Sequence, residues 1–278
     1  MTSWTPASVM EYVHVRDVEI PALGFGTWPM KGEDCRRSVE TALDVGYRHI
    51  DTAQMYENEE AVGEAIERSG VKREDVFLVT KILRRNLAHD DVLRSVEGSL
   101  DRLRTDIDLL LIHSPSETVP IEESIGAMNQ LQDDGSVEHI GVSNFSADQL
   151  REAIDASETP ILTNQVEYHP FESQEEALAF CIENDVMLTA YSPVAKGDVP
   201  GDETLNEIGD RYGKTEAQVA IRWLLQQDHV STIPKAASRE HQTENLDVFD
   251  FELTDEEMRS VFDLQGGIGS RLESLLGL

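Results

Sequence analysis

Residues 76–113 decide the fold, and they read VFLVTKILRRNLAHDDVLRSVEGSLDRLRTDIDLLLIH. The segments at 76–80 and 107–112 are short and almost wholly apolar, which is typical of strands buried on both faces. Residues 89–103 between them place apolar side chains at helical spacing. A strand, a helix and a second strand in this order indicate one unit of a parallel sheet with a helix packed on its face.

The same alternation continues along the chain in both directions. Further strand candidates lie at 22–25, 47–50, 137–142, 161–166, 186–191 and 230–233. Amphipathic stretches of helical length lie at 34–45, 58–69, 121–133, 146–156 and 173–183, with a longer pair across 202–227. Together with the two strands above, this gives eight strands that alternate with helices. Such a series predicts a parallel sheet closed into a barrel.

The N-terminal part and the chain length complete the fold prediction. Two short apolar segments flank Arg16 and Asp17, which predicts a β-hairpin over 13–20. An open doubly wound sheet fits less well, because 24–29, GFGTWP, has no third glycine for a GxGxxG turn. We therefore expect an α/β fold, a (β/α)8 TIM barrel with an N-terminal β-hairpin, in a single domain over 1–278.

The charge of the chain is strongly negative. It has 54 Asp and Glu against 23 Lys and Arg, a formal net charge of -31. Such a surface repels nucleic-acid phosphates and anionic membranes, so we expect neither as a partner, and self-repulsion favours a monomer. An acidic surface also tolerates concentrated salt, where the screening length falls to about 3 Å at 1 M. We therefore hypothesise a salt-adapted, halophilic source.

Cysteine usage and the N-terminus bear on location. The two cysteines, Cys35 and Cys181, lie far apart, so neither a disulfide framework nor a CxxC pair is available. Residues 1–6, MTSWTP, carry no basic start with an apolar run, and no segment approaches about 18 apolar residues. No HxxxH or HExxH spacing pairs the histidines, so we expect no metal site. These features favour a soluble, cytoplasmic protein.

Polar side chains appear where three neighbouring strands end. Asp51 ends the second strand, and Tyr56 lies one turn further along the chain. Lys81 ends the third strand, and His113 directly follows the fourth. Because the carboxyl ends of barrel strands meet at one rim, we expect these four side chains to lie together.

These four residue types suit hydride transfer to a carbonyl. The carbonyl oxygen becomes an alkoxide as hydride arrives, so a group such as Tyr56 has to supply a proton. We expect the Lys81 cation to lower the pKa of Tyr56, and Asp51 to keep a buried Lys81 charged. A neutral His113 would donate a hydrogen bond that orients the carbonyl oxygen.

Seven ordered motifs extend this pattern over nearly the whole chain. They are GYRHIDTA at 46–53, TK at 80–81, LLIH at 110–113, GVSNF at 141–145, NQVEYHP at 164–170, AYSP at 190–193, and IPK at 233–235 with EN at 244–245. On these motifs the chain resembles the aldo-keto reductase superfamily, in its prokaryotic, diketogluconate reductase-like branch. The resemblance implies an enzyme that reduces aldehydes or ketones to alcohols with a nicotinamide cofactor.

The resemblance also implies roles for individual residues. The catalytic tetrad would be Asp51, Tyr56, Lys81 and His113, with Tyr56 as the proton donor. The residues implied to bind the cofactor are Thr27, Asp51, Ser143, Asn144, Gln165, Tyr191, Ser192, Pro193, Val194, Lys235, His241, Glu244 and Asn245. Trp28, Tyr56 and His113 would line the substrate pocket.

Two departures from the family pattern concern the cofactor. Ala236 replaces a serine near the expected 2′-phosphate, and His241 stands where an arginine is usual. Histidine is charged only part of the time, whereas arginine holds a phosphate permanently and bidentately. Lys235 remains, and Arg239 can compensate. We therefore expect NADP(H) as the cofactor, with NAD(H) also used.

Two other functions compete with this interpretation. A barrel glycosidase would need two carboxylates, for which Asp51 and Glu167 can be nominated, but it leaves Tyr56 and Lys81 without a purpose. The non-enzymatic alternative is a nicotinamide-binding regulatory subunit without significant turnover. Small aldehydes, α-dicarbonyls and keto-sugars all stay open as substrates, because pocket loops determine this choice.

Overall fold

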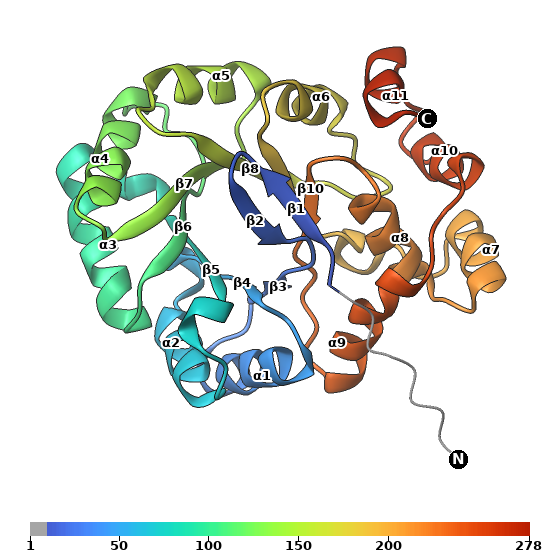
Figure 1. Ribbon diagram of the computed structural model, residues 1–278, viewed down its shortest axis with the longest axis horizontal. Coiled ribbons are helices and arrows are strands. Elements are labelled where there is room, and N and C mark those ends of the chain that lie inside the picture. Colours follow the sequence, from blue (N-terminus) through green and yellow to red (C-terminus); the bar gives the residue numbers. More distant parts are fainter. Residues whose placement is uncertain (1–9) are drawn as a thin grey trace.

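The computed structural model describes residues 10–278, and its centre is a sheet of eight parallel strands (Figure 1). In chain order the strands are β3 (Phe25–Gly26), β4 (His49–Asp51), β5 (Phe77–Ile82), β6 (Ile107–Ile112), β7 (Val137–Ser143), β8 (Ile161–Glu167), β9 (Met187–Tyr191) and β10 (Val230–Thr232). Each strand pairs with the next in chain order. The prediction for 1–6 lies outside the described residues, as does the start of the expected 1–278 domain.

Backbone hydrogen bonds between the first and last strand regions close the sheet. The amide of Thr232 donates to the carbonyl of Ala22 (2.9 Å), and the amide of Gly24 donates to the carbonyl of Thr232 (2.8 Å). Leu23 and Thr232 thereby form a parallel bridge. The α/β barrel predicted from the strand series is confirmed.

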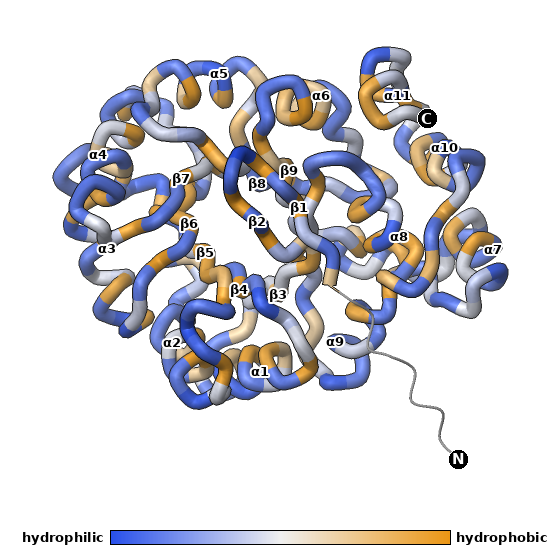
Figure 2. Tube along the Cα trace, viewed as in Figure 1, coloured by the Kyte–Doolittle hydropathy of each residue, from blue (hydrophilic) through white to orange (hydrophobic). Residues whose placement is uncertain are grey.

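Helices surround the barrel. They are α1 (Gly32–Val45), α2 (Glu59–Arg68), α3 (His89–Leu103), α4 (Ile121–Asp133), α5 (Ala147–Ala156), α6 (Glu175–Glu183), α7 (Glu203–Tyr212), α8 (Glu216–Leu225), α9 (Arg239–Leu246), α10 (Asp255–Asp263) and α11 (Ser270–Leu276). Apolar residues gather along the strands and hydrophilic residues on the outer turns (Figure 2), as expected for helices with one buried face. Capping boxes fix several starts: Thr215 with Gln218 caps α8, and Thr254 with Glu257 caps α10.

The predicted N-terminal hairpin is confirmed and covers the base of the barrel, the end opposite the carboxyl ends of the strands. Its strands are β1 (Tyr12–Val15) and β2 (Val18–Pro21), paired antiparallel. Val15 and Ile20 are fully buried and pack with apolar side chains of the strand interiors. These side chains are Val79, Leu109, Leu111, Leu162 and Met187. The base of the barrel is therefore a dry core, and the opposite rim is where polar side chains gather.

Two described helices, α9 and α10, have no counterpart in the sequence prediction, and the short helix α11 follows the segment 266–269 at the end of the chain. The α11 helix packs on α6, where Arg271 bonds to Glu183. Among residues 10–278, no helix is long and apolar enough to cross a membrane.

Candidate active site at the carboxyl rim

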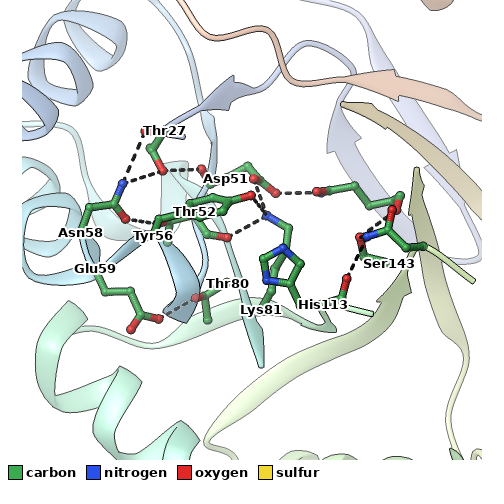
Figure 3. A network of polar contacts seen from close by, with 12 residues as sticks. Thr27, Asp51, Thr52, Tyr56, Asn58, Glu59, Thr80, Lys81, His113 and Ser143 are labelled. Atoms are coloured by element: carbon green, nitrogen blue, oxygen red, sulfur yellow. Dashed lines mark hydrogen bonds and ion pairs between the residues drawn. The ribbon is translucent and has the colours of Figure 1, made fainter. Parts of the chain in front are cut away.

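The four predicted tetrad residues come together at the rim (Figure 3). Asp51 is the last residue of β4, and Lys81 lies near the end of β5. Tyr56 ends the short 3₁₀ turn η1 (Gln54–Tyr56) between β4 and α2. His113 directly follows β6, and its amide donates to the carbonyl of Ile82 (3.1 Å). The parallel register of β4, β5 and β6 thus carries residues from separate motifs to one place.

The Lys81 ammonium is the centre of this group. It donates to Asp51 Oδ1 (2.6 Å), to the carbonyl of Thr52 (2.9 Å) and to Tyr56 Oη (3.3 Å). Lys81 and Asp51 are both buried, at 0% and 1% exposure. The Tyr56 ring packs edge-on against the His113 imidazole, with centroids 5.8 Å apart. The phenol is therefore in contact with a cation on one side and an imidazole on the other.

Burial and charge shift the pKa values of this group. Burial disfavours the Lys81 cation, but Asp51 and Tyr56 outweigh it, so the pKa of Lys81 lies above its ordinary value. Burial, followed by the Lys81 charge, lowers the pKa of His113 to about 4, which keeps the imidazole neutral at physiological pH.

The pKa of Tyr56 does not fall below its ordinary value, although Lys81 acts on it as expected. Burial raises the pKa of Tyr56, the Lys81 cation lowers it, and Asp51 raises it again, with a net pKa above the ordinary value. Lys81 acts in the predicted direction, but desolvation of the phenolate is the larger effect. The phenol of the protein alone is therefore protonated, which is the state that a proton donor needs.

A chain of hydrogen bonds leads from the tetrad around the cavity. Gln165 Nε2 donates to Asp51 Oδ2 (2.8 Å), and Ser143 Oγ donates to the carbonyl of Gln165 (2.8 Å). Asn144 Nδ2 donates to Ser143 Oγ (3.1 Å) and to the carbonyl of His113 (2.9 Å). The chain ends where Tyr191 Oη donates to Asn144 Oδ1 (3.0 Å).

An open cavity of about 590 Å³ lies above these groups. The predicted site residues that line it are Thr27, Trp28, Asp51, Tyr56, His113, Ser143, Asn144, Gln165, Tyr191, Ser192, Pro193, Val194 and Lys235. It is also lined by residues outside the predicted tetrad, cofactor and pocket residues: Gly26, Pro29, Met55, Glu167, Lys196, Gly197 and Ile233. Of these, only Glu167 was nominated, for the glycosidase alternative. It ends β8 and pairs with Lys196 (2.5 Å). The position of Glu167 at a strand end was the available signal.

Four predicted residues do not line this cavity. Lys81 lies beneath it and reaches it only through Tyr56 and Asp51. His241, Glu244 and Asn245 lie on α9, beside the loop that carries Lys235. His241 is exposed and Asn245 is buried. Their predicted contacts with a cofactor stay predictions.

The cation at the cavity edge fits an anionic ligand. Lys235 is exposed and has no ion-pair or hydrogen-bond partner within residues 10–278. It lines both the main cavity and a neighbouring hollow of about 660 Å³, which share Pro29 as a second lining residue. Arg239, suggested above as compensation, is paired with Asp44 (2.6 Å). The cavity thus offers the amides of Asn144 and Gln165, the Tyr191 ring and the unpaired ammonium of Lys235. This combination suits a nicotinamide nucleotide.

Within 10–278, no group of three or more His, Cys, Asp or Glu side chains is arranged to hold an ion. Nor are Asp51 and Glu167 free for glycoside hydrolysis. Both oxygens of Asp51 are engaged by Lys81 and Gln165, and Glu167 is held by Lys196.

Comparisons with known proteins agree with this geometry. The Aldo/keto reductase family matches residues 22–265. A glyoxal reductase of Bacillus subtilis is 38% identical over 92% of this chain and 93% of its own length. A solved structure provisionally named 2,5-diketo-D-gluconic acid reductase B superposes with a TM-score of 0.91 at 49% identity, covering 93% of this chain and 92% of its own.

A further solved structure bears on the cofactor. An aldo-keto reductase of Bombyx mori in complex with NADP has a TM-score of 0.86 at 32% identity, covering 92% of this chain and 94% of its own. Nothing in these similarities supports a regulatory subunit. The chain belongs to the aldo/keto reductase family, as an oxidoreductase that reduces carbonyl groups and takes a nicotinamide cofactor.

Proposed function

We propose that this chain reduces small aldehydes and ketones with NADP(H), and that Tyr56 donates the proton to the carbonyl oxygen. The observation that supports this most directly is the Tyr56 phenol, 3.3 Å from a Lys81 ammonium that is itself 2.6 Å from Asp51. Tyr56 and His113 both line the cavity, so one carbonyl oxygen can approach both.

In the proposed mechanism each side chain has a distinct task. The hydride would come from a reduced nicotinamide bound in the cavity. Tyr56 gives its hydroxyl proton to the carbonyl oxygen as charge develops there. The Lys81 cation stabilises the phenolate that remains, and Asp51 keeps this cation charged at a fully buried position. Neutral His113 donates a second hydrogen bond to the same oxygen and orients the carbonyl.

The cofactor preference that we propose is NADP(H) with substantial use of NAD(H). The free ammonium of Lys235 supports a phosphate group at that edge. Ala236 offers no hydroxyl, and His241 is a weaker phosphate partner than an arginine. Ser192, Pro193 and Val194 line the cavity where a pyrophosphate would pass, and we propose that Glu244 and Asn245 hold the adenosine.

The substrate that we propose is a small, uncharged carbonyl such as an α-dicarbonyl, with keto-sugars as the next class. The glyoxal reductase among the relatives supports this choice. The open mouth carries the exposed side chains of Trp28 and Met55, at 53% and 51% exposure. The Lys196 ammonium, which also lines the cavity, is paired with Glu167, so this cation is not free to attract a carboxylate.

We further propose a monomeric enzyme of one domain in a salt-rich cytoplasm. The net charge of -31 supports both parts of this proposal, because it opposes self-association at low salt and is screened at high salt. Purified protein that is equally stable in dilute buffer and in molar KCl would contradict the salt adaptation.

The Tyr56→Phe variant tests the proposed function. Oxidation of NADPH and NADH is followed against a panel of aldehydes and ketones, glyoxal included, in molar salt. We expect turnover by the wild-type chain and a fall of about 10²- to 10⁴-fold in kcat for the variant, with cofactor binding retained. Wild-type protein that binds NADPH but turns over no carbonyl would support the regulatory alternative instead.

A further inference from the structure

Gln54 lies outside the cavity, yet it occupies the first position of the turn that ends in Tyr56. It belongs to η1, where the Tyr56 amide donates to the carbonyl of Ala53 (3.0 Å) and the Glu57 amide donates to that of Gln54 (3.3 Å). The side chain of Gln54 is buried, at 8% exposure. Its turn neighbours Met55 and Glu57 are exposed, and the ion pair that Glu57 makes with Lys31 is exposed as well.

The Gln54 amide uses its whole hydrogen-bonding capacity. Its Oε1 accepts from the Leu83 amide (3.0 Å) and from Asn86 Nδ2 (3.3 Å). Its Nε2 donates to the carbonyl of Ser95 (3.1 Å) and to Ser99 Oγ (3.1 Å). An amide offers two donors and two acceptor lone pairs, and here each has a partner. Such a saturated side chain is held in one position.

The partners of Gln54 belong to the structure that also positions Lys81. Leu83 lies two residues beyond Lys81, just after the end of β5, and the two serines lie on α3, which follows. The other side of the turn is held separately. Asn58 accepts from Thr52 Oγ1 (2.6 Å) and donates to Thr27 Oγ1 (3.1 Å).

We propose that Gln54 is a positioning residue that fixes the distance between the Tyr56 phenol and the Lys81 ammonium by tying the donor turn to the lysine strand. This inference rests on the proposed function of Tyr56. A misplacement of about 1 Å at a reacting group can cost about 10²-fold in rate, so the loss of this amide lowers kcat. The amide does not line the cavity, so cofactor affinity is unaffected.

The test compares Gln54→Met, Gln54→Glu and a matched control, Gln226→Met. Gln226 also clamps backbone, accepting from the Leu253 amide (2.7 Å) and donating to its carbonyl (3.0 Å), but between α8 and the start of α10. For each protein, kcat, the Kd for NADPH from protein fluorescence, and the solvent isotope effect on kcat are measured. Hydrogen exchange of the segment 53–59 is followed without substrate.

We expect kcat of Gln54→Met to fall about tenfold with an unchanged Kd, a larger solvent isotope effect and faster exchange over 53–59. Gln54→Glu keeps the acceptor for the Leu83 amide, so its kcat should lie between those of the wild type and Gln54→Met. Gln226→Met should match the wild type in kcat and in hydrogen exchange over 53–59. Two outcomes would overturn the inference: an unchanged exchange rate over 53–59, or a kcat of Gln54→Met that falls only in proportion to the fraction binding NADPH. Absence of turnover in the wild type would instead refute the proposed function. Hydrogen exchange over 53–59 would still show whether Gln54 holds the turn in place.

Discussion

The base and the rim of the barrel interior are built by the same strands and differ in chemistry. On β5, Val79 packs in the dry core beneath the hairpin, and Lys81, two residues on, carries a buried charge at the rim. On β6, Leu109 belongs to the core and His113, four residues on, borders the cavity. Side chains at such spacings point to the same side of a strand. On these two strands, the side chains near the base therefore build the core, and those at the rim carry the chemistry.

The largest expected effect at the rim comes from Lys81→Met. Without the cation, the phenolate that forms when Tyr56 gives up its proton is no longer stabilised, so we expect kcat to fall about 10³-fold, or about 4 kcal/mol in the barrier. The measurement is kcat at saturating NADPH, scaled to the folded fraction from circular dichroism.

Stability changes in the same variant for a different reason. Lys81→Met leaves the Asp51 carboxylate buried without its charge partner, which should lower the free energy of unfolding by about 3–5 kcal/mol. Adding Asp51→Asn removes that charge and should recover much of the stability without recovering turnover. If turnover returned together with stability, Lys81 would act through the fold and not through the phenol.

The base should show the opposite behaviour in Leu109→Ala. The side chain is 1% exposed and packs in the cluster beneath the hairpin, so its truncation leaves a cavity. We expect the free energy of unfolding to fall by about 2–5 kcal/mol in urea titrations, with kcat of the folded protein unchanged. A loss of kcat as large as that of the rim variant would mean that base and rim are coupled.

Strand ends explain how much of the site could be predicted. Asp51, Lys81 and His113 lie at the ends of apolar runs, and Tyr56 lies one turn beyond Asp51, so the barrel fold brings the four together. Gln54 carries no such signal, because a polar residue in a loop is ordinary and its partners on β5 and α3 appear only after folding. The net pKa of Tyr56 also escaped prediction, since it depends on the depth of burial, a tertiary property.

The same reasoning applies to the fold. The strands and most barrel helices follow from periodicity, but α9, with the sequence REHQTENL, is polar on nearly every face. Its buried residues are Gln242 and Asn245, and Gln242 donates to the carbonyls of Ser38 and Ala236. Hydrogen bonds hold much of this helix, and Leu246 is the one apolar residue of its sequence, so hydrophobic spacing does not reveal it. For α10, the capping box of Thr254 and Glu257 was a readable signal.

A smaller difference between rim and base should appear in the pH dependence of stability. Burial and Lys81 lower the pKa of His113 to about 4 from an ordinary 6.5, so the unfolded chain binds more protons between these values. The free energy of unfolding should therefore fall as pH drops from about 6.5 to about 4. His113→Asn should remove on the order of 2 kcal/mol of this fall, allowing for partial solvent exposure of the ring.

His139, on β7 near the base, is the control for this measurement, because burial lowers its pKa too, while the carboxylates of Glu138 and Asp108 oppose that change. Urea titrations at several pH values are run for both variants. We expect His139→Asn to change the pH dependence of the free energy of unfolding less than His113→Asn does. Equal changes would show that the rim charge of Lys81 adds nothing to burial.

The smallest effect is expected at the hairpin turn, where a surface ion pair fastens the base. Arg16 Nε lies 3.4 Å from Asp185 Oδ2, and its guanidinium donates to the carbonyl of Asn184 (2.8 Å). Both charged side chains are about half exposed, so Arg16→Ala should cost at most about 1 kcal/mol in free energy of unfolding and leave kcat unchanged. Part of this cost comes from the hydrogen bond to a neutral carbonyl, which salt screens less than the ion pair. Raising KCl from 0.1 to about 2 M should therefore reduce the difference between Arg16→Ala and the wild type without abolishing it, whereas a difference that grows with salt would contradict an electrostatic origin.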